Sequence, residues 1–312
     1  MSEVRNDIAE SVAVIGLGSM GFGMAASLIR SGHAVVGYDP SPVAMKKLAD
    51  AGGRAAASPA DAAAGAGVVV CVVVNSTQTD AVLYGENGVA AVMQPGSAFI
   101  SSATMAPAEA RRLAAGLAQR GIHYLDAPIS GGAAKAASGE LTVMASGNPA
   151  AFEQAQRVLD AIAAKVYRLG DEPGIGASMK MINQHLAGIH IAAAAEAIAL
   201  ASKLGLDLAK VHEVITASAG NSWMFENRVP HILAGDYTPL SSVEIFVKDL
   251  GILQDMARAE RYPAPLAAAA LQMYLATSGA GMGRDDDSSV ARTYAMLSGA
   301  TLPPVTATAS KS

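Results

Sequence analysis

The chain has 312 residues, of which 51% are hydrophobic and 16% are charged, a composition typical of a folded globular protein rather than a disordered one. Its formal net charge is -5, and lysine and arginine are scattered without a basic run, which argues against a nucleic-acid partner. Cys71 is the only cysteine, so no disulfide can form within the chain, and a reducing compartment is expected.

The first ten residues, "MSEVRNDIAE", are polar and acidic, unlike a signal peptide. No run of eighteen or more consecutive strongly apolar residues follows them. We therefore expect a cytoplasmic protein that has no membrane partner.

The first half of the chain alternates short β-branched runs with segments rich in alanine and leucine. Strands are predicted over 11–16, 34–39, 67–74, 97–102, 122–128, 141–147 and 163–170, and helices over 20–31, 42–51 and 107–120. Repeated βαβ units predict an α/β domain with a mainly parallel, doubly wound sheet of the Rossmann type. Valine-rich runs without alternation, such as 67–74, indicate strands that are covered on both faces.

Turn-forming residues in "GDEPGIG" indicate a domain boundary, which divides the chain into domains 1–176 and 177–312. After Ser178 the strand patterns disappear. Helices are predicted over about 178–202, 207–218, 222–233, 243–260, 264–279 and 287–296. The second domain is therefore expected to be all-α.

A glycine-rich turn lies between the first strand and the first helix. Glycines here permit a tight turn and a close backbone approach to a pyrophosphate, which the helix N-terminus attracts. Asp39 lies 23 positions beyond Gly16, where a carboxylate can bind the ribose hydroxyls and favours NAD over NADP. The alternative is a structural turn with a surface aspartate. The residues expected at the cofactor are Gly16, Leu17, Gly18, Ser19, Met20, Gly21 and Asp39.

Polar residues follow three of the other predicted strands, and ligands of doubly wound sheets bind beyond the carboxyl ends of the strands. Asn75 and Thr104 are candidate cofactor contacts for this reason. The run Ser130, Gly131 and Gly132 can direct several backbone N–H groups toward one point and bind a carboxylate. An ordinary loop is an equally good interpretation of that run.

Lys180 lies near the start of a long apolar segment, and helical spacing places Asn183 and Gln184 on its face, opposite Ile182 and Leu186. A neutral lysine, which burial favours, can take the proton of a substrate hydroxyl. Alternatively Lys180 binds the substrate carboxylate. A lysine whose stem covers apolar surface is a third interpretation, and the helix alone favours it.

Two further segments combine polar and apolar residues. Lys248 and Asp249 are neighbours between apolar residues, which fits an interdomain ion pair or a site contact, although helix neighbours need not pair with each other. Trp223, near Phe225, is a candidate pocket residue, with core or subunit-contact roles as alternatives. The six histidines show no metal-ligand spacing, so no metal is expected.

Four motifs together resemble the β-hydroxyacid dehydrogenases, the family of the 3-hydroxyisobutyrate and tartronate semialdehyde enzymes. They are "GLGSMGFGMA", "DAPISGGAAKAASGELTVMASG", "GIGASMKMINQ" and "FVKDLGI". The resemblance implies NAD, a small hydroxy acid substrate, and a helical domain that supports a homodimer or homotetramer. It also implies that Lys180 is the catalytic acid/base, that Ser130–Gly132 binds the substrate carboxylate, and that Thr104 and Lys248 lie at the cofactor.

The segments "QHLAGIHIAAAAEA" and "GNSWMFENR" are most similar to a branch of bacterial enzymes that oxidise L-threonate at C2 to a 2-oxo acid. Many family members place asparagine four residues after the lysine, where this chain has Gln184. Asn183, Gln184 and Trp223 are the candidate residues for recognising the substrate. Alternatives within the class are a 3-hydroxyisobutyrate dehydrogenase or a tartronate semialdehyde reductase. An alternative outside it is a non-catalytic nucleotide-binding module.

Overall fold

The computed structural model describes residues 11–309, so the segment considered for a signal peptide lies outside the described residues. The chain divides into two compact units, and the division falls after Lys180. Each unit has its own core, and each is described by itself below.

The first unit is built on one sheet whose strands run in the order β3, β2, β1, β4, β5, β6, β8, β7, with β9 also paired to β8. The strands from β3 to β6 are parallel neighbours, whereas β8 is antiparallel to β6 and β7. The elements are β1 (Ser11–Ile15), α1 (Ser19–Arg30), β2 (Ala34–Tyr38), α2 (Pro42–Asp50), β3 (Arg54–Ala55), α3 (Pro59–Ala63), β4 (Val68–Cys71), α4 (Ser76–Tyr84), η1 (Val89–Ala91), β5 (Ala98–Ser101), α5 (Pro107–Ala118), β6 (His123–Asp126), β7 (Ile129–Ser130), α6 (Gly132–Ser138), β8 (Leu141–Ser146), α7 (Pro149–Ile162) and β9 (Ala163–Gly170). The first six strands have the order of a doubly wound dinucleotide-binding sheet, which confirms the predicted fold class.

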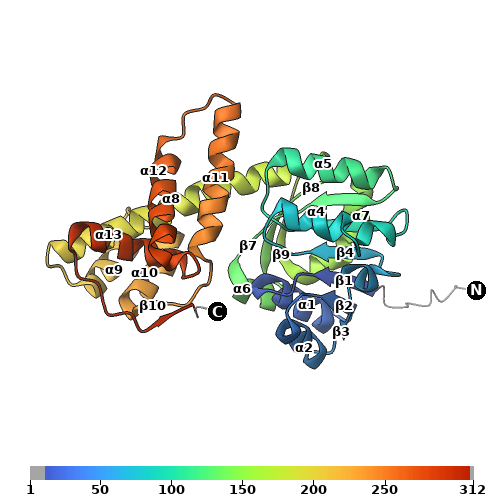
Figure 1. Ribbon diagram of the computed structural model, residues 1–312, viewed down its shortest axis with the longest axis horizontal. Helices are drawn as coiled ribbons and strands as arrows, with labels where there is room; N and C mark the ends of the chain where they lie inside the picture. The colour runs from blue at the N-terminus through green and yellow to red at the C-terminus, as the bar shows by residue number, and fades with distance from the viewer. Residues whose placement is uncertain (1–10, 310–312) are drawn as a thin grey trace, which may run out of the picture. The chain divides into compact units, whose positions relative to one another are not determined.

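Both faces of the central strands β1, β4 and β5 are buried, as the valine-rich runs predict. Val12 and Val14 of β1 pack in one cluster with residues of α1 and α7. Ala13 and Ile15 point to the other face, where α4 and α5 contribute the covering side chains. Figure 1 shows α4 and α5 together on one side of the sheet. The alternation along one strand therefore serves two separate layers of core.

Ser130–Gly132 forms a strand-to-helix turn, whereas an ordinary loop was one of the two interpretations of this run. Ser130 ends strand β7 and pairs with Thr142 of β8, and Gly132 begins helix α6. The alanines of α6 are good helix formers but give no apolar periodicity, so the pattern did not indicate a helix. The short elements β3 and α3 were missed for the same lack of a periodic signal.

The end of β6 holds the start of α8 (Ile175–Lys203) through a buried carboxylate. Asp126, of which 1% is exposed, accepts hydrogen bonds from the backbone N–H groups of Gly174 and Ala177, both at 2.8 Å. Ser146 accepts a third bond from Gly176 at 2.9 Å. A Cβ on Gly176 would lie 2.5 Å from the carbonyl oxygen of Met144, so only glycine allows this approach. These bonds satisfy N–H groups that helices otherwise leave unpaired.

The second unit is helical, and α8, α10, α11 and α12 supply most of its core. Its elements after α8 are α9 (Leu208–Thr216), α10 (Trp223–Ala234), β10 (Asp236–Tyr237), α11 (Val243–Ala259), α12 (Pro265–Thr277), η2 (Ser278–Met282), η3 (Asp287–Ser289), α13 (Val290–Ser298) and β11 (Ala307–Thr308). The Tyr274 hydroxyl donates to the carbonyl oxygen of Gly188 at 3.0 Å and connects α12 to α8. By length and composition α8 is apolar enough to cross a membrane, but half of its most apolar window is buried within the protein, as in a core helix.

Two short strands add to the helices of the second unit. β10 and β11 pair in parallel, although the sequence shows no strand pattern there. Gly235, at a φ of 64°, lets the chain turn after α10, and a Cβ on it would lie only 1.9 Å from the carbonyl oxygen of Pro304. The pairing of β10 with β11 therefore accompanies a close backbone contact at Gly235 rather than a side-chain pattern.

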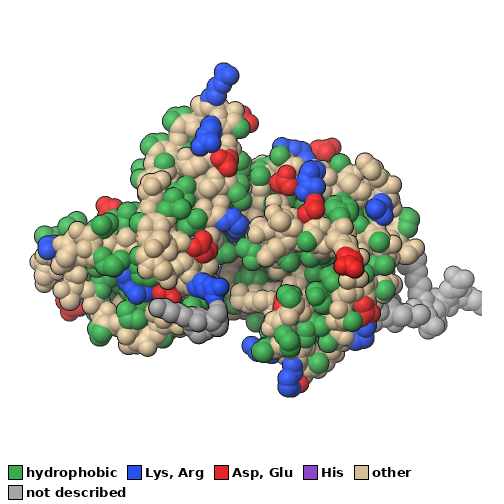
Figure 2. Space-filling model, viewed as in Figure 1, with side chains coloured by type: hydrophobic (Ala, Val, Ile, Leu, Met, Phe, Trp, Pro, Cys, Tyr) green, Lys and Arg blue, Asp and Glu red, His purple; other side chains and the backbone are tan. Residues whose placement is uncertain are grey.

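Surface and buried charges are arranged differently. Figure 2 shows acidic and basic side chains mixed across the described residues of one face. Inside the second unit, Arg228 donates to both carboxylate oxygens of Asp287, at 2.6 and 3.2 Å. Both side chains are buried, and removing one partner would leave the other charge unpaired in the core. The pair therefore connects α10 to the η3 turn.

The carboxyl group of Asp126 predicts a pH dependence of stability. Burial raises the pKa of Asp126 to about 6, although the hydrogen bonds from the N–H groups of Ala177 and Gly174 act to lower it. Because the folded pKa exceeds the unfolded value, the folded state binds this proton more tightly. The stability that protonated Asp126 contributes is complete below about pH 4 and is lost as the pH rises through about 6. Relative to Asp126→Asn, the wild type should lose about 3 kcal/mol of stability over that range.

Urea unfolding of both proteins between pH 4 and 7 measures this difference. Asp50→Asn, which removes an exposed carboxylate of α2, controls for the loss of one acidic group. A difference between wild type and Asp126→Asn that stays constant with pH would contradict the prediction.

Candidate active site

The loop after β1 has the geometry of a dinucleotide cradle. Gly16 has a φ of +91°, and a Cβ on it would lie 2.4 Å from the carbonyl oxygen of Val72. A Cβ on Gly21 would lie 1.9 Å from the carbonyl oxygen of Gly16. A Cβ on Gly18 would meet no protein atom within 4 Å, so the loop is open on that side. The first and third glycines close the turn, and the second leaves space for a ligand.

The N-terminus of α1 has no side-chain cap. Gly18 at the N-cap position offers no side-chain acceptor, and the first turn contains no acidic residue. By contrast, Ser41, Asn75 and Asn148 cap α2, α4 and α7 with side-chain oxygens. The N–H groups at the start of α1 can therefore bind an anion, which fits the pyrophosphate of a dinucleotide.

Asp39 follows β2 and lies directly against this loop. Its carboxylate accepts hydrogen bonds from the backbone N–H of Leu17 at 2.7 Å and of Ser41 at 2.8 Å. Two backbone groups thus hold the carboxylate in one orientation beside the glycine loop. Its remaining lone pairs suit the ribose hydroxyls of an adenosine. Loop, helix end and carboxylate together fit NAD.

The other predicted residues of the first unit follow neighbouring strands. Asn75 comes after β4 and Thr104 after β5, and β1, β4 and β5 are adjacent and parallel, so these residues lie along one edge of the sheet. Asn75 also caps α4, because its side chain accepts from the N–H of Gln78 at 2.8 Å. Gly131 and Gly132, with φ values of +133° and +76°, form a sharp strand-to-helix turn after Ser130. Such a turn can present backbone N–H groups to an anion.

Helix α8 buries its polar face. Lys180 and Gln184 are each only 8% exposed, whereas Ile182 and Leu186 are 54% and 52% exposed. The predicted grouping of Lys180 with Gln184 on one face is thus observed. At this exposure Lys180 is not a solvated surface lysine.

The polar residues predicted in the second unit form one hydrogen-bonded group. Gln184 donates to Asp249 of α11 at 2.5 Å, and Asn183 donates to Gln184 at 3.0 Å. Lys248 and Asp249 form an ion pair with each other, although neighbouring helix positions need not pair. Trp223 is 58% exposed at the start of α10, which excludes the core role considered for it.

Two buried carboxylates were not predicted as functional residues. Asp126 ends a predicted strand and begins the motif "DAPISGG", so its position at a strand end was the available signal. Asp249 was considered only together with Lys248, as an interdomain ion pair or a site contact, and was not among the predicted site residues. In both cases burial, which one sequence does not reveal, is what distinguishes the residue.

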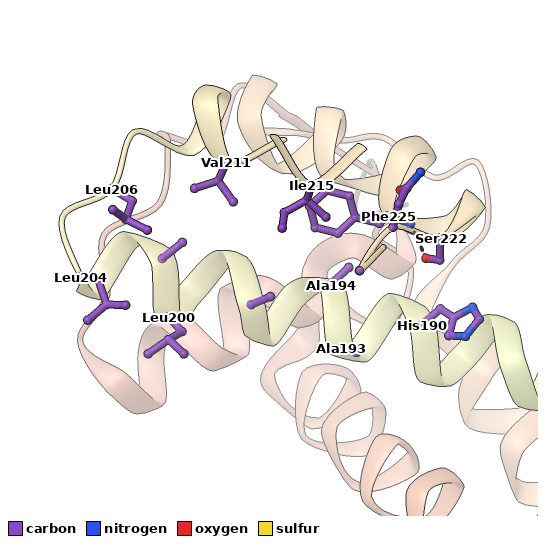
Figure 3. Close-up of a pocket in the computed structure, with 14 residues that line it drawn as sticks. His190, Ala193, Ala194, Leu200, Leu204, Leu206, Val211, Ile215, Ser222 and Phe225 are labelled. Carbon is purple, nitrogen blue, oxygen red and sulfur yellow. Dashed lines mark hydrogen bonds between the residues drawn. The ribbon is translucent and has the colours of Figure 1, made fainter. Parts of the chain in front are cut away.

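The second unit contains a groove. Figure 3 shows it between the second half of α8, α9 and the start of α10. It encloses about 550 Å³ and is lined mainly by apolar side chains, among them Leu204, Val211 and Ile215. None of the predicted site residues lines it. Among residues 11–309 no group of three or more histidine, cysteine, aspartate or glutamate side chains could hold a metal ion.

Comparison with known proteins covers almost the whole chain. Residues 11–170 match the NAD binding domain of 6-phosphogluconate dehydrogenase, and residues 174–294 match the NAD-binding region of NADP-dependent 3-hydroxyisobutyrate dehydrogenase. The L-threonate dehydrogenase of Cupriavidus necator is 56% identical over 92% of this chain and 97% of its own length. That of Escherichia coli K12 is 50% identical over 94% and 96%. This chain belongs to the β-hydroxyacid dehydrogenases related to 3-hydroxyisobutyrate dehydrogenase.

A solved relative agrees with the fold of this dehydrogenase. The crystal structure of a 3-hydroxyisobutyrate dehydrogenase from Salmonella typhimurium is 50% identical, has a TM-score of 0.88, and covers 91% of this chain and 99% of its own. The family, the fold class and the NAD-dependent hydroxyacid dehydrogenase activity predicted from the sequence are therefore confirmed.

Gly18→Ala should separate cofactor binding by this dehydrogenase from its folding. The residue has a φ of −65° and an extended ψ, which alanine also adopts, and its Cβ would contact no protein atom. Thermal stability should therefore remain at the wild-type value. The methyl group would occupy the space left for the pyrophosphate, so the Kd for NAD should rise at least about tenfold.

Isothermal titration with NAD and thermal unfolding of the free protein measure the two effects. Gly21→Ala is the comparison, because its Cβ would collide with the loop itself and should lower stability as well. Wild-type NAD affinity in Gly18→Ala would refute the proposed position of the cofactor.

Proposed function

We propose that this chain is an L-threonate dehydrogenase, which oxidises the C2 hydroxyl of L-threonate to a 2-oxo acid. The observation that carries the proposal is the 50–56% identity to L-threonate dehydrogenases over more than nine-tenths of the chain. The Salmonella relative named as a 3-hydroxyisobutyrate dehydrogenase is also 50% identical, which makes 3-hydroxyisobutyrate the second candidate substrate. Asp39 favours NAD over NADP, since its carboxylate would repel a 2′-phosphate.

The resemblance to the β-hydroxyacid dehydrogenases supports the proposed roles of the residues. NAD, when bound, supplies the hydride acceptor for the reaction. Lys180, which is buried on the polar face of α8, takes the proton of the C2 hydroxyl on its Nζ. The turn at Ser130, Gly131 and Gly132 binds the substrate carboxylate through backbone N–H groups and the serine hydroxyl.

The remaining predicted residues belong to the same proposal. Asn183 and Gln184, on the same face of α8 as Lys180, orient the substrate hydroxyls. Trp223, exposed at the start of α10, contributes to the substrate pocket. The glycine loop, with Leu17, Ser19 and Met20, holds the cofactor together with Asn75, Thr104 and Lys248.

A panel of hydroxy acids tests the function. NAD reduction is followed with L-threonate, D-threonate, 3-hydroxyisobutyrate and glycerate, and kcat/KM should be highest for L-threonate. A higher value for 3-hydroxyisobutyrate would replace the proposed substrate with the second candidate.

The same panel run with Lys180→Ala tests the chemistry. Loss of a general base should lower kcat by about 10² to 10⁴-fold, and NAD affinity should stay at the wild-type value. Lys210→Ala, on the exposed surface of α9, is the control for removal of a lysine. Unchanged turnover in Lys180→Ala would exclude Lys180 as the base.

We further propose a cytoplasmic homodimer or homotetramer. Apolar side chains of α8 are exposed, with Ile182, Leu186 and Leu200 each more than half accessible, and they are accompanied by the apolar groove of Figure 3. Exposed apolar surface of this kind supports association between copies of the chain.

Light scattering after size exclusion measures the assembly. The wild type should elute at two or four times the subunit mass, and Leu200→Glu should shift it toward the monomer. A wild-type monomer at micromolar concentration would contradict the proposal.

A further inference from the structure

Four polar side chains of the second unit form one continuous chain of hydrogen bonds. Lys248 pairs with one oxygen of Asp249, and Gln184 donates its Nε2 to the other oxygen at 2.5 Å. Asn183 then donates its Nδ2 to the Oε1 of Gln184 at 3.0 Å. Asp249 is 1% exposed and Gln184 is 8% exposed, so water does not replace these partners.

The buried carboxylate determines the direction of every bond in this chain. A carboxylate paired with a lysine can only accept hydrogen bonds, so Gln184 must turn its Nε2 toward Asp249. The Oε1 of Gln184 then faces Asn183, which must donate its Nδ2 to it. The Oδ1 of Asn183 is thereby left at the outer end of the chain, where it can only accept.

We propose that Asp249 is a positioning residue that orients both amides, so that the Oδ1 of Asn183 accepts a hydrogen bond from a second hydroxyl of the substrate. The inference rests on the proposed function and deepens it. An acid with a further hydroxyl beside the oxidised one satisfies this acceptor. An acid with only an alkyl group there leaves it unpaired and is rejected, which is how sites built on polar groups discriminate.

A merely structural role predicts a different result. If Asp249 serves only to neutralise Lys248 or to join α8 to α11, its loss lowers stability or turnover equally for all substrates. If Asp249 acts through Asn183, its loss lowers the preference for a hydroxylated substrate over an alkyl one. The ratio of kcat/KM between two such acids distinguishes the roles, since effects on cofactor and folding cancel in it.

The experiment uses L-threonate and 2-hydroxybutanoate, which has the same carbon chain but lacks the hydroxyls at C3 and C4. The wild type should prefer L-threonate, and Asn183→Ala should lower that preference about 10- to 100-fold. Asp249→Asn, which lets both amides reverse, should lower it to a similar extent. The double variant should show no further loss, because both changes remove the same interaction.

Two further variants complete the design. Asn183→Leu, a side chain of similar size that has no acceptor for the substrate hydroxyl, should also lose the preference even if Asp249→Asn is too unstable to assay. Asp255→Asn, an exposed carboxylate on the same helix, should keep the wild-type ratio.

The outcomes separate this inference from the proposed function. A wild type without preference for L-threonate refutes the proposed function and this inference together. A wild type that prefers L-threonate, with variants at Asn183 and Asp249 that keep the preference, refutes the inference alone. Additive losses in the double variant would show that Asp249 does not act through Asn183.

Discussion

The hydrogen bonds of Asp126 to the start of α8 are the constraint that fixes where the helix carrying Lys180 begins on the sheet. The carboxylate ends β6, is buried, and holds two backbone N–H groups of the helix that carries Lys180. A carboxylate at a helix N-terminus is stabilised by the unpaired N–H groups and the helix dipole, whereas burial destabilises its charge. Burial prevails in the pKa of Asp126, which is raised to about 6. The bonds that fix the start of the helix carrying Lys180 therefore require a buried carboxylate whose charged form is destabilised.

The cofactor cradle is made by backbone contacts more than by side chains. Gly16 and Gly21 approach other backbone atoms so closely that any Cβ would collide, and Asp39 holds the N–H of Leu17. The loop therefore has its shape before a ligand arrives. The start of α1 lacks the side-chain cap present on α2, α4 and α7. A helix end left uncapped beside a rigid turn is prepared for an anion, and little ordering cost remains for binding to overcome.

Much of this architecture follows from patterns that one sequence contains. Valine-rich strands, glycine spacing and Asp39 depend on local rules, so the doubly wound sheet and its cradle were predictable. The short strand β7 and helix α6 were not, because alanine-rich segments without periodicity carry little signal. The sequence also did not reveal which charged side chains are buried. Helical spacing grouped Lys180 with Gln184 but did not reveal that this face, rather than Ile182 and Leu186, is the buried one.

The contact between α8 and α11 explains why the polar face of α8 is the buried one. A Cβ on Gly188 would lie 2.9 Å from the ring of Phe246, so the two helices approach closely one turn beyond Gln184. At this distance the longer glutamine side chain reaches the carboxylate of Asp249 on the neighbouring helix. The polar face is buried because it has polar partners, which remove most of the cost of desolvating it. The amide of Gln184 is occupied by Asp249, and Asn183 therefore becomes the outermost amide of the face that carries Lys180.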